Sequence, residues 1–229
     1  MKRILKTLFI KIPLLYIVLS VILVIVLKFL PVRTTPLMWK RTFQNSGNTE
    51  FSIRKQWVPM REISPAAVKC VIASEDNRFA EHHGFDFDEM KKMKKEHDVK
   101  GKKWRGCSTI SQQTAKNVFT FGSHSMVRKV FEAYHTFLIE IFWGKERIME
   151  VYLNVIETGN GLFGIESAAR QYFNVPASRL DLNQSALIAA ILPNPSKWNP
   201  SRPTKYLLSR QKQIVGITRM LVYPEWVMK

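Results

Sequence analysis

The most prominent hydrophobic feature of the chain is an apolar run near the amino terminus. Residues 12–30 are mostly Leu, Ile and Val, with a single charge, Lys28, close to the end of the run. Roughly 20 apolar residues cross the hydrocarbon core of a bilayer. A cleavable signal peptide has a shorter apolar region, of about 7–15 residues, followed by small residues at a cleavage site, and none is evident before the prolines at 31 and 36. The pattern therefore predicts an uncleaved transmembrane helix.

Basic residues predict how this helix is oriented. The residues that precede it include Lys2, Arg3, Lys6 and Lys11. Positively charged flanks stay in the cytoplasm, while Lys28 can extend its ammonium group to the opposite interface. We expect a single-pass membrane protein with its amino terminus in the cytoplasm and its main domain on the outer side of the membrane. The predicted parts are a cytoplasmic basic tail (1–11), a transmembrane helix (12–30), a connector (31–62) and a main domain (63–229).

After the span, the pattern predicts a mostly α-helical domain. Prolines and a Gly47-Asn48 pair mark the connector, which has one short extended piece around residues 51–58. Apolar residues then recur at helical spacing, and strand-like alternation is almost absent. Ser64 and Pro65 form a helix start that leads into residues 66–76. Further helices are predicted over residues 108–117, 125–142, 145–154, 164–173, 182–192 and 203–221.

The charge balance points to a polyanionic partner. The chain has 35 Lys and Arg residues against 18 Asp and Glu, a formal charge of +17. Nucleic acid, anionic lipid and a phosphorylated substrate all suit this balance. The outward orientation argues against nucleic acid and favours membrane lipid and a lipid phosphate. The basic stretch from Lys91 to Arg105 is expected to be a loop, either solvated or resting on anionic headgroups. Whether Cys70 and Cys107 pair stays open.

The first helix of the domain carries a candidate general base. Val68, Ile72 and Glu75 stand at positions i, i+4 and i+7, which places a carboxylate on the face that points into the core. Desolvation raises the pKa of a carboxyl group toward values that suit a base. The ordinary alternative is a Glu at a helix end that turns out to solvent. This helix alone does not decide between the two.

Two further helices carry polar groups suited to a sugar and its phosphate. Ser108 can cap the helix over 108–117, and Thr109, Gln113 and Lys116 fall on one face of it. In the following helix Glu132 lies within one turn of Arg128 and Lys129. The pair Arg128–Glu132 reads either as an ordinary surface ion pair or as a carboxylate kept ionised among cations. The buried side of that helix is predicted to contain Val127, Val130, Phe131, Tyr134, Leu138 and Ile141.

Five ordered segments now carry a family resemblance. They read SEDNRFAEHHGFD, GCSTISQQTAKN, RKVFEAYHTFLIE, KERIMEVYLNVIETGNGLFGIESAARQYF and LNQSALIAAILPNPSKWNP, across residues 74–200. In this order they resemble the peptidoglycan glycosyltransferases. The chain looks like a monofunctional, biosynthetic member, because no room follows for the transpeptidase domain of bifunctional penicillin-binding proteins.

The resemblance implies that residues 63–229 form a peptidoglycan glycosyltransferase domain, which is lysozyme-like and helical with a membrane-associated jaw. It also implies a bacterial cytoplasmic (inner) membrane, with this domain on the periplasmic or extracellular face. It implies polymerisation of glycan strands from lipid II, with inversion to a β-1,4 bond, release of undecaprenyl diphosphate and no nucleotide sugar. Glu75 matches the catalytic base. Glu132 matches the second essential Glu, which assists the diphosphate through a divalent cation (Mg²⁺ or Mn²⁺) or through nearby cations. The implied partners are lipid II, the growing strand, membrane lipid, and penicillin-binding or cell-division proteins.

The remaining motif residues are expected to contact substrate or shape the site. Lys116, Arg128 and Lys129 are the predicted diphosphate contacts, because cations there stabilise the charge on the leaving group. For Lys145 and Arg147, substrate contact and structural support are equally expected. The full set of predicted substrate-site residues is Asp76, Phe79, His82, Ser108, Thr109, Gln112, Gln113, Lys116, Asn117, Arg128, Lys129, Lys145 and Arg147.

Three residues depart from the family pattern: Cys107, Ser111, where Thr is common, and Thr114, where an apolar residue is common. Two other functions also suit parts of the sequence. Cys107 stands where the family usually has Gly, which puts in doubt the backbone just before the Ser108 cap if positive φ is needed there. A lytic transglycosylase would share the fold and a catalytic Glu, but it needs neither an anchor nor a cationic cradle for diphosphate. An inactive membrane-tethered scaffold would need neither Glu75 nor Glu132.

Overall fold

The computed structural model describes residues 2–101, 106–121 and 125–228, and side chains from Ile10 onward apart from Lys100. Within these residues the protein is mostly α-helical, as predicted, with three short strands. The elements are α1 (Lys2–Phe29), α2 (Pro36–Gln44), β1 (Arg54–Lys55), η1 (Met60–Glu62), α3 (Pro65–Glu75), α4 (Phe87–Lys100), α5 (Ile110–Phe119), α6 (Met126–Phe142), α7 (Lys145–Val155), β2 (Glu157–Gly159), β3 (Leu162–Phe163), α8 (Ile165–Phe173), η2 (Ala177–Arg179), α9 (Leu182–Ile191), α10 (Lys205–Met220) and α11 (Glu225–Met228).

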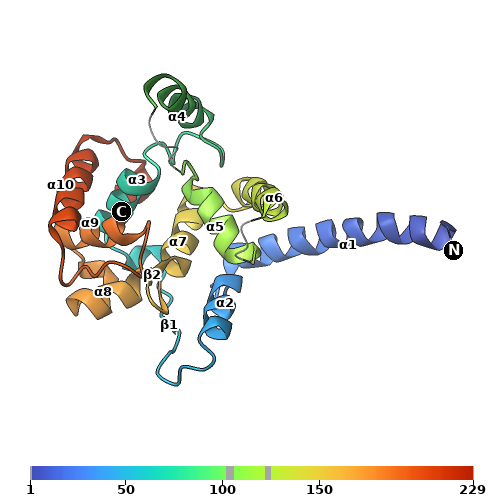
Figure 1. Cartoon of the computed structure of the whole chain (residues 1–229), viewed down its shortest axis with the longest axis horizontal. Coiled ribbons are helices and arrows are strands. Elements are labelled where there is room, and N and C mark those ends of the chain that lie inside the picture. The colour runs from blue at the N-terminus through green and yellow to red at the C-terminus, as the bar shows by residue number, and fades with distance from the viewer. Residues whose placement is uncertain (1, 102–105, 122–124, 229) are drawn as a thin grey trace.

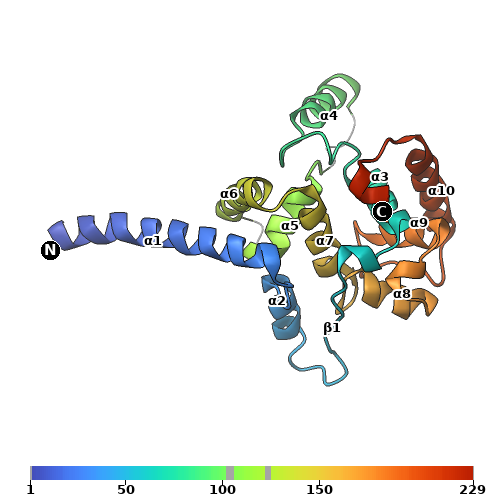
Figure 2. The same cartoon turned by 180° about the vertical axis from the view of Figure 1, so that it is seen from behind.

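Helix α1 projects from a helical body, and the body lies at its carboxyl end (Figures 1 and 2). Its 20 residues Ile10–Phe29 are long and apolar enough to cross a membrane, and only 11% of the most apolar window is buried inside the protein. An apolar helix that avoids its own protein core supports membrane anchoring. The side chains of Lys2, Arg3 and Lys6 lie outside the described residues, so the orientation of the helix stays a prediction.

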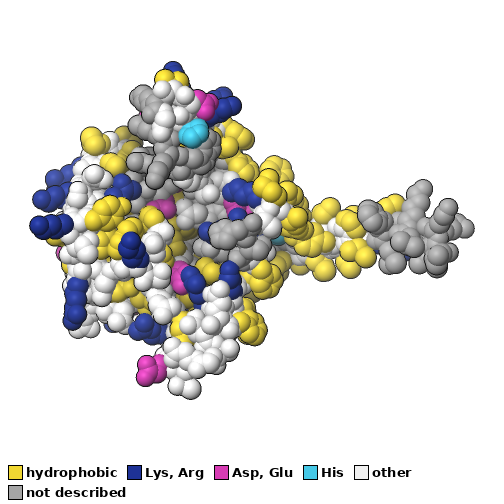
Figure 3. All heavy atoms as spheres, in the orientation of Figure 1, with side chains coloured by type: hydrophobic (Ala, Val, Ile, Leu, Met, Phe, Trp, Pro, Cys, Tyr) yellow, Lys and Arg dark blue, Asp and Glu magenta, His cyan; other side chains and the backbone are white. Residues whose placement is uncertain are grey.

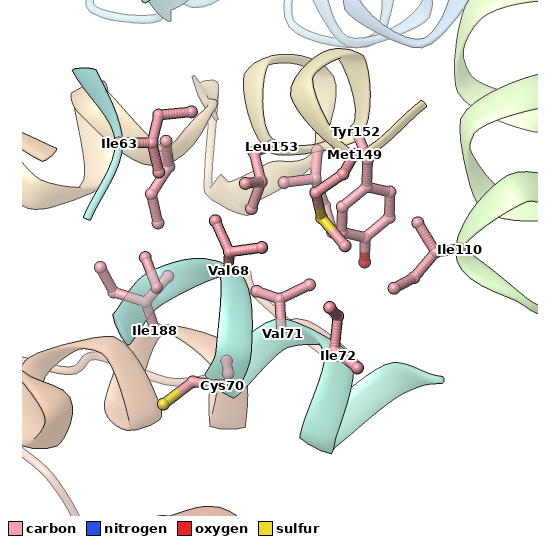
Figure 4. Packing of buried hydrophobic residues seen from close by; sticks show 14 of the residues in the cluster. Ile63, Val68, Cys70, Val71, Ile72, Ile110, Met149, Tyr152, Leu153 and Ile188 are labelled. Carbon is pink, nitrogen blue, oxygen red and sulfur yellow. The ribbon is translucent and has the colours of Figure 1, made fainter. Parts of the chain in front are cut away.

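The core forms around α3, whose backbone packs against α9 and α10, while side chains on another face of α3 meet those of α7 in the same buried cluster (Figure 4). Val68, Val71 and Ile72 of α3 point toward Met149 and Tyr152 of α7 (Figure 4). Helix α9 is buried along its whole second half, from residue 185 to 191. Because α3 is enclosed in this way, its last turn is fixed where the chain leaves the core.

The helix starts follow local sequence signals closely. Ser64 accepts a hydrogen bond from the Ala66 N–H and caps α3, as the sequence predicts. Helix α5 corrects one expectation: its N-cap is Thr109 and not Ser108. Thr109 accepts from the backbone of Gln112, and the Gln112 side chain accepts from the Thr109 N–H, so the two form a capping box. The capping box pairs two backbone N–H groups at the start of the helix, whereas the Ser108 side chain alone would pair one.

The expected buried side of α6 is wrong in most of its members. Leu138 is buried and Tyr134 is partly buried, but Val127, Val130, Phe131 and Ile141 are exposed by 65%, 67%, 41% and 57%. The buried side instead contains Glu132, His135, Thr136, Leu138 and Ile139. The apolar face of α6 points away from the core, next to α1, and hydrophobic side chains continue from α1 onto this edge of the body (Figure 3).

Three α-helices among the described residues were not predicted: α2, α4 and the short α11. Helix α4 occupies most of the basic stretch expected to be a loop, with Asp86 as its N-cap and Gly101 in the left-handed conformation at its end. Residues 102–105 of that stretch lie outside the described residues. Helix α2 lies within the predicted connector, and the boundaries proposed for the parts of the chain stay predictions. The expected extended piece is present as β1, which pairs in parallel with β3, while β2 pairs with β3 antiparallel.

The concern about Cys107 is answered by its backbone. Asn174 is the only residue other than glycine with positive φ in the part of the chain that the structure describes. Cys107 therefore adopts a conformation open to any residue, and a side chain at this position causes no backbone strain. Cys70 and Cys107 are both free thiols. Cys70 is buried, and burial raises the pKa of its thiol to about 11, which keeps it protonated and unreactive.

Asn154 joins α7 to the segment before α3. It is fully buried, donates to the Val58 carbonyl at 2.8 Å and accepts from the Val58 N–H at 2.9 Å. Replacement by Ala leaves both backbone groups unpaired, so Asn154→Ala is expected to lower the free energy of unfolding by about 2–4 kcal/mol. Denaturant unfolding in detergent, followed by circular dichroism, measures the change. The exposed Asn160→Ala variant is the control, and equal stability of the two variants would contradict this account.

Candidate active site

Glu75 is the last residue of α3, and it lines a cavity of about 430 Å³. The cavity is bounded by the end of α3, the start of α4, the segment before α5 and one face of α10. Ser108, Thr109 and Cys107 form part of its wall. The expected direction of the Glu75 side chain is thus confirmed in part: it leaves the core side of α3 and enters a solvent-connected hollow rather than open solvent.

The environment of Glu75 suits a general base. Gln113 donates from Nε2 to Oε2 at 3.1 Å, and the Ser74 hydroxyl donates to Oε1 at 3.2 Å. Burial raises the pKa of the Glu75 carboxyl above its ordinary value, while the bonds from Gln113 and Ser74 and the charge of Arg210 act in the opposite direction. A carboxylate with a raised pKa binds a proton more strongly than a solvated one, yet it is held in position by two donors.

Asp76 and His82 fix the loop that follows Glu75. The two carboxylate oxygens of Asp76 lie 2.9 and 3.0 Å from Nε2 of His82 and form hydrogen bonds with it. One of these oxygens also accepts from the backbone N–H of Ile110 at 3.0 Å. The ring of Phe79 is fully buried and packs edge-on against His82. These three residues join the end of α3 to the start of α5. The contacts agree with the supporting role expected for them and place Gln113 of α5 opposite Glu75.

A second carboxylate lies in different surroundings. Glu132 of α6 is 2% exposed, and each of its oxygens accepts from a cation, one from the Arg128 guanidinium and one from the Lys129 ammonium. An exposed i,i+4 pair contributes only a few tenths of a kcal/mol, but here the carboxylate is buried and both partners reach it. Glu132 therefore fixes the position of two cations beside the site.

Lys116 of α5 interacts electrostatically with both carboxylates, Glu75 and Glu132. Its side chain remains open to solvent, but desolvation by the surrounding protein lowers the pKa of its ammonium. Glu132 and Glu75 raise this pKa, and Arg128 and Lys129 lower it. The three cations that were predicted to contact diphosphate therefore form one electrostatic cluster. A polyanion would relieve the repulsion among them.

The donor set around Glu132 does not fit a bound divalent cation in this conformation. Both carboxylate oxygens already accept from Arg128 and Lys129. Among the residues that the structure describes, no group of three His, Cys, Asp or Glu side chains lies close enough together to hold a metal ion. Mg²⁺ and Mn²⁺ prefer several oxygen ligands. The expectation of a divalent cation thus rests on the family resemblance alone.

The other predicted site residues have mainly structural contacts. Thr109 donates to the Gly84 carbonyl at 2.7 Å, Gln112 completes the α5 cap, and Asn117 is buried. Lys145 pairs with Glu140 at 2.7 Å and stacks over the Phe79 ring at 4.6 Å. Arg147 pairs with Glu150 at 2.6 Å and donates to the carbonyls of Leu27 and Leu30 at the end of α1. These contacts favour structural support for Lys145 and Arg147.

Arg210 of α10 was missed by the sequence interpretation. It lines the cavity opposite Glu75, and its guanidinium lies 3.5 Å from the Ser74 carbonyl. A signal was present, because Arg210 lies three residues after Leu207 and four before Ile214, which are both fully buried. A cation on the buried face of a helix indicates a specific partner. The groups that it faces, the Ser74 carbonyl and the Glu75 carboxylate, are 136 and 135 residues away in the sequence, so local spacing could not indicate them.

Comparison with known proteins identifies the family. The transglycosylase family model matches residues 43–220. A biosynthetic peptidoglycan transglycosylase of Bacteroides thetaiotaomicron is 53% identical over 203 residues, which cover 88% of this chain and 82% of that protein. Proteins of the same description from Caulobacter vibrioides and Bdellovibrio bacteriovorus are each 48% identical, over 93% and 90% of this chain and over 90% and 83% of their own lengths.

The chain belongs to the transglycosylase family of peptidoglycan glycosyltransferases. It is an enzyme that polymerises the glycan strands of peptidoglycan.

The position of Arg210 predicts a change in pH dependence. The groups that face Glu75 are Asp76 beside it, Lys116 and Gln113 of α5, Tyr152 of α7 and Arg210 of α10. Removing the Arg210 charge raises the pKa of Glu75 further, so the base is protonated at a higher pH. Arg210→Gln is expected to move the acidic limb of the kcat/KM profile to higher pH. Arg219→Gln, exposed on the same helix, is the control, and an unmoved limb in Arg210→Gln would exclude this coupling.

Proposed function

We propose that Glu75 is the general base of an inverting glycosyl transfer between lipid-linked substrates. The 4-hydroxyl of the acceptor lipid II gives its proton to Glu75 and attacks the anomeric carbon of the growing strand. The bond from that carbon to the diphosphate oxygen breaks, and undecaprenyl diphosphate leaves with the electron pair. Attack from the opposite side forms the β-1,4 bond. The observation that supports this most is a desolvated carboxylate, held by two donors, on the wall of a cavity.

The leaving diphosphate needs positive charge, and the cationic cluster supplies it. Lys116, Arg128 and Lys129 are the predicted contacts, and Glu132 holds two of them. Cations that are already in place stabilise the developing charge without reorganisation during the reaction. Glu132 acts in this proposal through the cations that it positions. No step requires a metal ion, and any divalent cation would have to displace Arg128 or Lys129 from Glu132.

The membrane topology belongs to the same proposal. Helix α1 would cross the bacterial inner membrane with its basic end in the cytoplasm, and the site would lie on the outer face, where the lipid-linked substrate is presented. The exposed apolar face of α6 next to α1 supports a body that rests against the bilayer. Penicillin-binding and cell-division proteins are expected partners on the resemblance alone.

The role of Glu75 is tested by removing its charge without changing its shape. Glu75→Gln is expected to reduce strand polymerisation from purified lipid II by roughly 10²–10⁴-fold, because the proton acceptor is lost. Gel analysis of labelled glycan chains measures the loss. Glu89→Gln, a change in the same cavity wall, is the control and should retain activity. Full polymerisation by Glu75→Gln would refute the assignment, and release of soluble muropeptides from sacculi by the parent would indicate cleavage instead.

The cationic cluster is tested at Lys116. Lys116→Ala is expected to lower turnover by roughly 10²–10³-fold, the range found when one donor to a developing anion is removed. Steady-state kinetics on lipid II measure it, and Lys212→Ala, an exposed position on α10, controls for the loss of a surface charge. Normal turnover by Lys116→Ala would mean that the diphosphate does not use this residue.

A further inference from the structure

Helix α2 carries an exposed pair of aromatic side chains. Trp39 and Phe43 are 53% and 70% exposed, and their rings stack with centroids 6.3 Å apart. Positions i and i+4 lie on the same face of a helix, so the two rings form one apolar surface. Single exposed apolar residues are common in proteins, but a stacked Trp and Phe on one short helix is a larger apolar area than the fold itself requires.

The opposite face of α2 is fixed to the catalytic body. Met38 is 3% exposed, and Arg41 forms a two-pronged ion pair with the nearly buried Glu157 of β2, at 2.9 and 2.8 Å. A bidentate pair of this kind sets the orientation of the guanidinium as well as its distance. The direction in which Trp39 and Phe43 point is therefore determined by the body and not by a loose connector.

The segment between α1 and α2 is also held. Lys55 of β1 donates to the carbonyls of Val32 and Arg33, and Thr35 caps α2 by accepting from the Met38 N–H. Burial lowers the pKa of the Lys55 ammonium to about 8. Only residues 30–35 separate the end of α1 from the start of α2. In both views α2 runs across the line of α1, at the place where α1 meets the body (Figures 1 and 2).

We propose that α2 is an interfacial helix, and that Trp39 and Phe43 lie among the lipid headgroups of the bilayer that α1 crosses. The inference rests on the proposed topology of α1. A helix that runs across the membrane normal, close to the end of a span, lies along the bilayer surface. Trp is suited to that depth because its ring is apolar while its N–H can still bond to water or headgroups. Amphipathic helices bind the interface through such an apolar face.

This contact would add a second point of attachment beside α1. A single transmembrane helix leaves the whole protein free to rotate about the helix axis and to tilt in the bilayer. A surface helix on one side, joined rigidly to β2 through Arg41 and Glu157, restricts both motions. The cavity with Glu75 would then stay at a constant height above the membrane, which suits an acceptor whose sugar is carried on a lipid.

The test measures the surroundings of Trp39 in the full chain reconstituted in phospholipid vesicles. The fluorescence that distinguishes the parent from Trp39→Phe is assigned to Trp39. It is expected to be lost with phospholipids brominated near the headgroup and to be shielded from iodide in the buffer. Trp198→Phe is the matched control, because Trp198 packs on Tyr206 of α10, at the end of the body away from α1. Its emission should not respond to the brominated lipid.

The outcomes separate this inference from the topology on which it rests. Vesicle flotation and protection of the amino terminus from added protease report whether α1 is inserted. If α1 is inserted while the Trp39 emission is quenched by iodide and not by brominated lipid, α2 faces water and the proposal is overturned. Shielding from iodide without quenching by brominated lipid would mean a protein contact, such as a second copy, and would overturn it too. Failure of flotation would refute the topology as well.

Discussion

The enclosure of α3 is the constraint on which the site depends. Helix α3 is packed against α9 on one side and meets side chains of α7 on another (Figure 4), so its last residue, Glu75, has a fixed position at the edge of the core. The same enclosure removes water from the carboxylate, which raises the pKa of the group. Position and proton affinity thus have one physical cause. Gln113 and Ser74 then restrict the carboxylate without neutralising it.

The two carboxylates divide the electrostatic work of the site. Glu75 has amide and hydroxyl donors, so its negative charge remains available to a proton. Both oxygens of Glu132 accept hydrogen bonds from cations, so its charge holds Arg128 and Lys129 in position. Lys116 interacts electrostatically with both carboxylates and thus couples Glu75 to the cations at Glu132. The proposed reaction, in which Glu75 accepts a proton and the cations at Glu132 receive the diphosphate, uses this separation of charge.

Local signals in the sequence predicted the helices well and the long-range contacts poorly. The starts of α3 and α6 follow from Ser64 and Ser125, because a cap involves residues only a few positions apart. The predicted buried face of α6 was wrong because hydrophobic periodicity shows which residues share an apolar face, but not whether protein or lipid covers that face. The side of α6 that packs against the protein contains Glu132 and His135 instead. Arg210 was missed because its meaning depends on Glu75, which the fold alone brings near. Helix α2 is short and begins at Pro36, so it resembled a turn.

The hydrogen bonds at the end of α1 have a consequence for how lipid acts on the enzyme. Trp143, at the end of α6, donates to the Val24 carbonyl, and Arg147 of α7 donates to those of Leu27 and Leu30, so the end of α1 is hydrogen-bonded to both helices. Tyr152 of α7 in turn bonds to Gln113, which bonds to Glu75. A membrane span tilts when its length and the bilayer thickness differ. Because α1 is hydrogen-bonded to the body, such a tilt would be transmitted to α7, the helix behind Glu75, the proposed base. A change in bilayer thickness would thereby shift the residues that hold Glu75 in position.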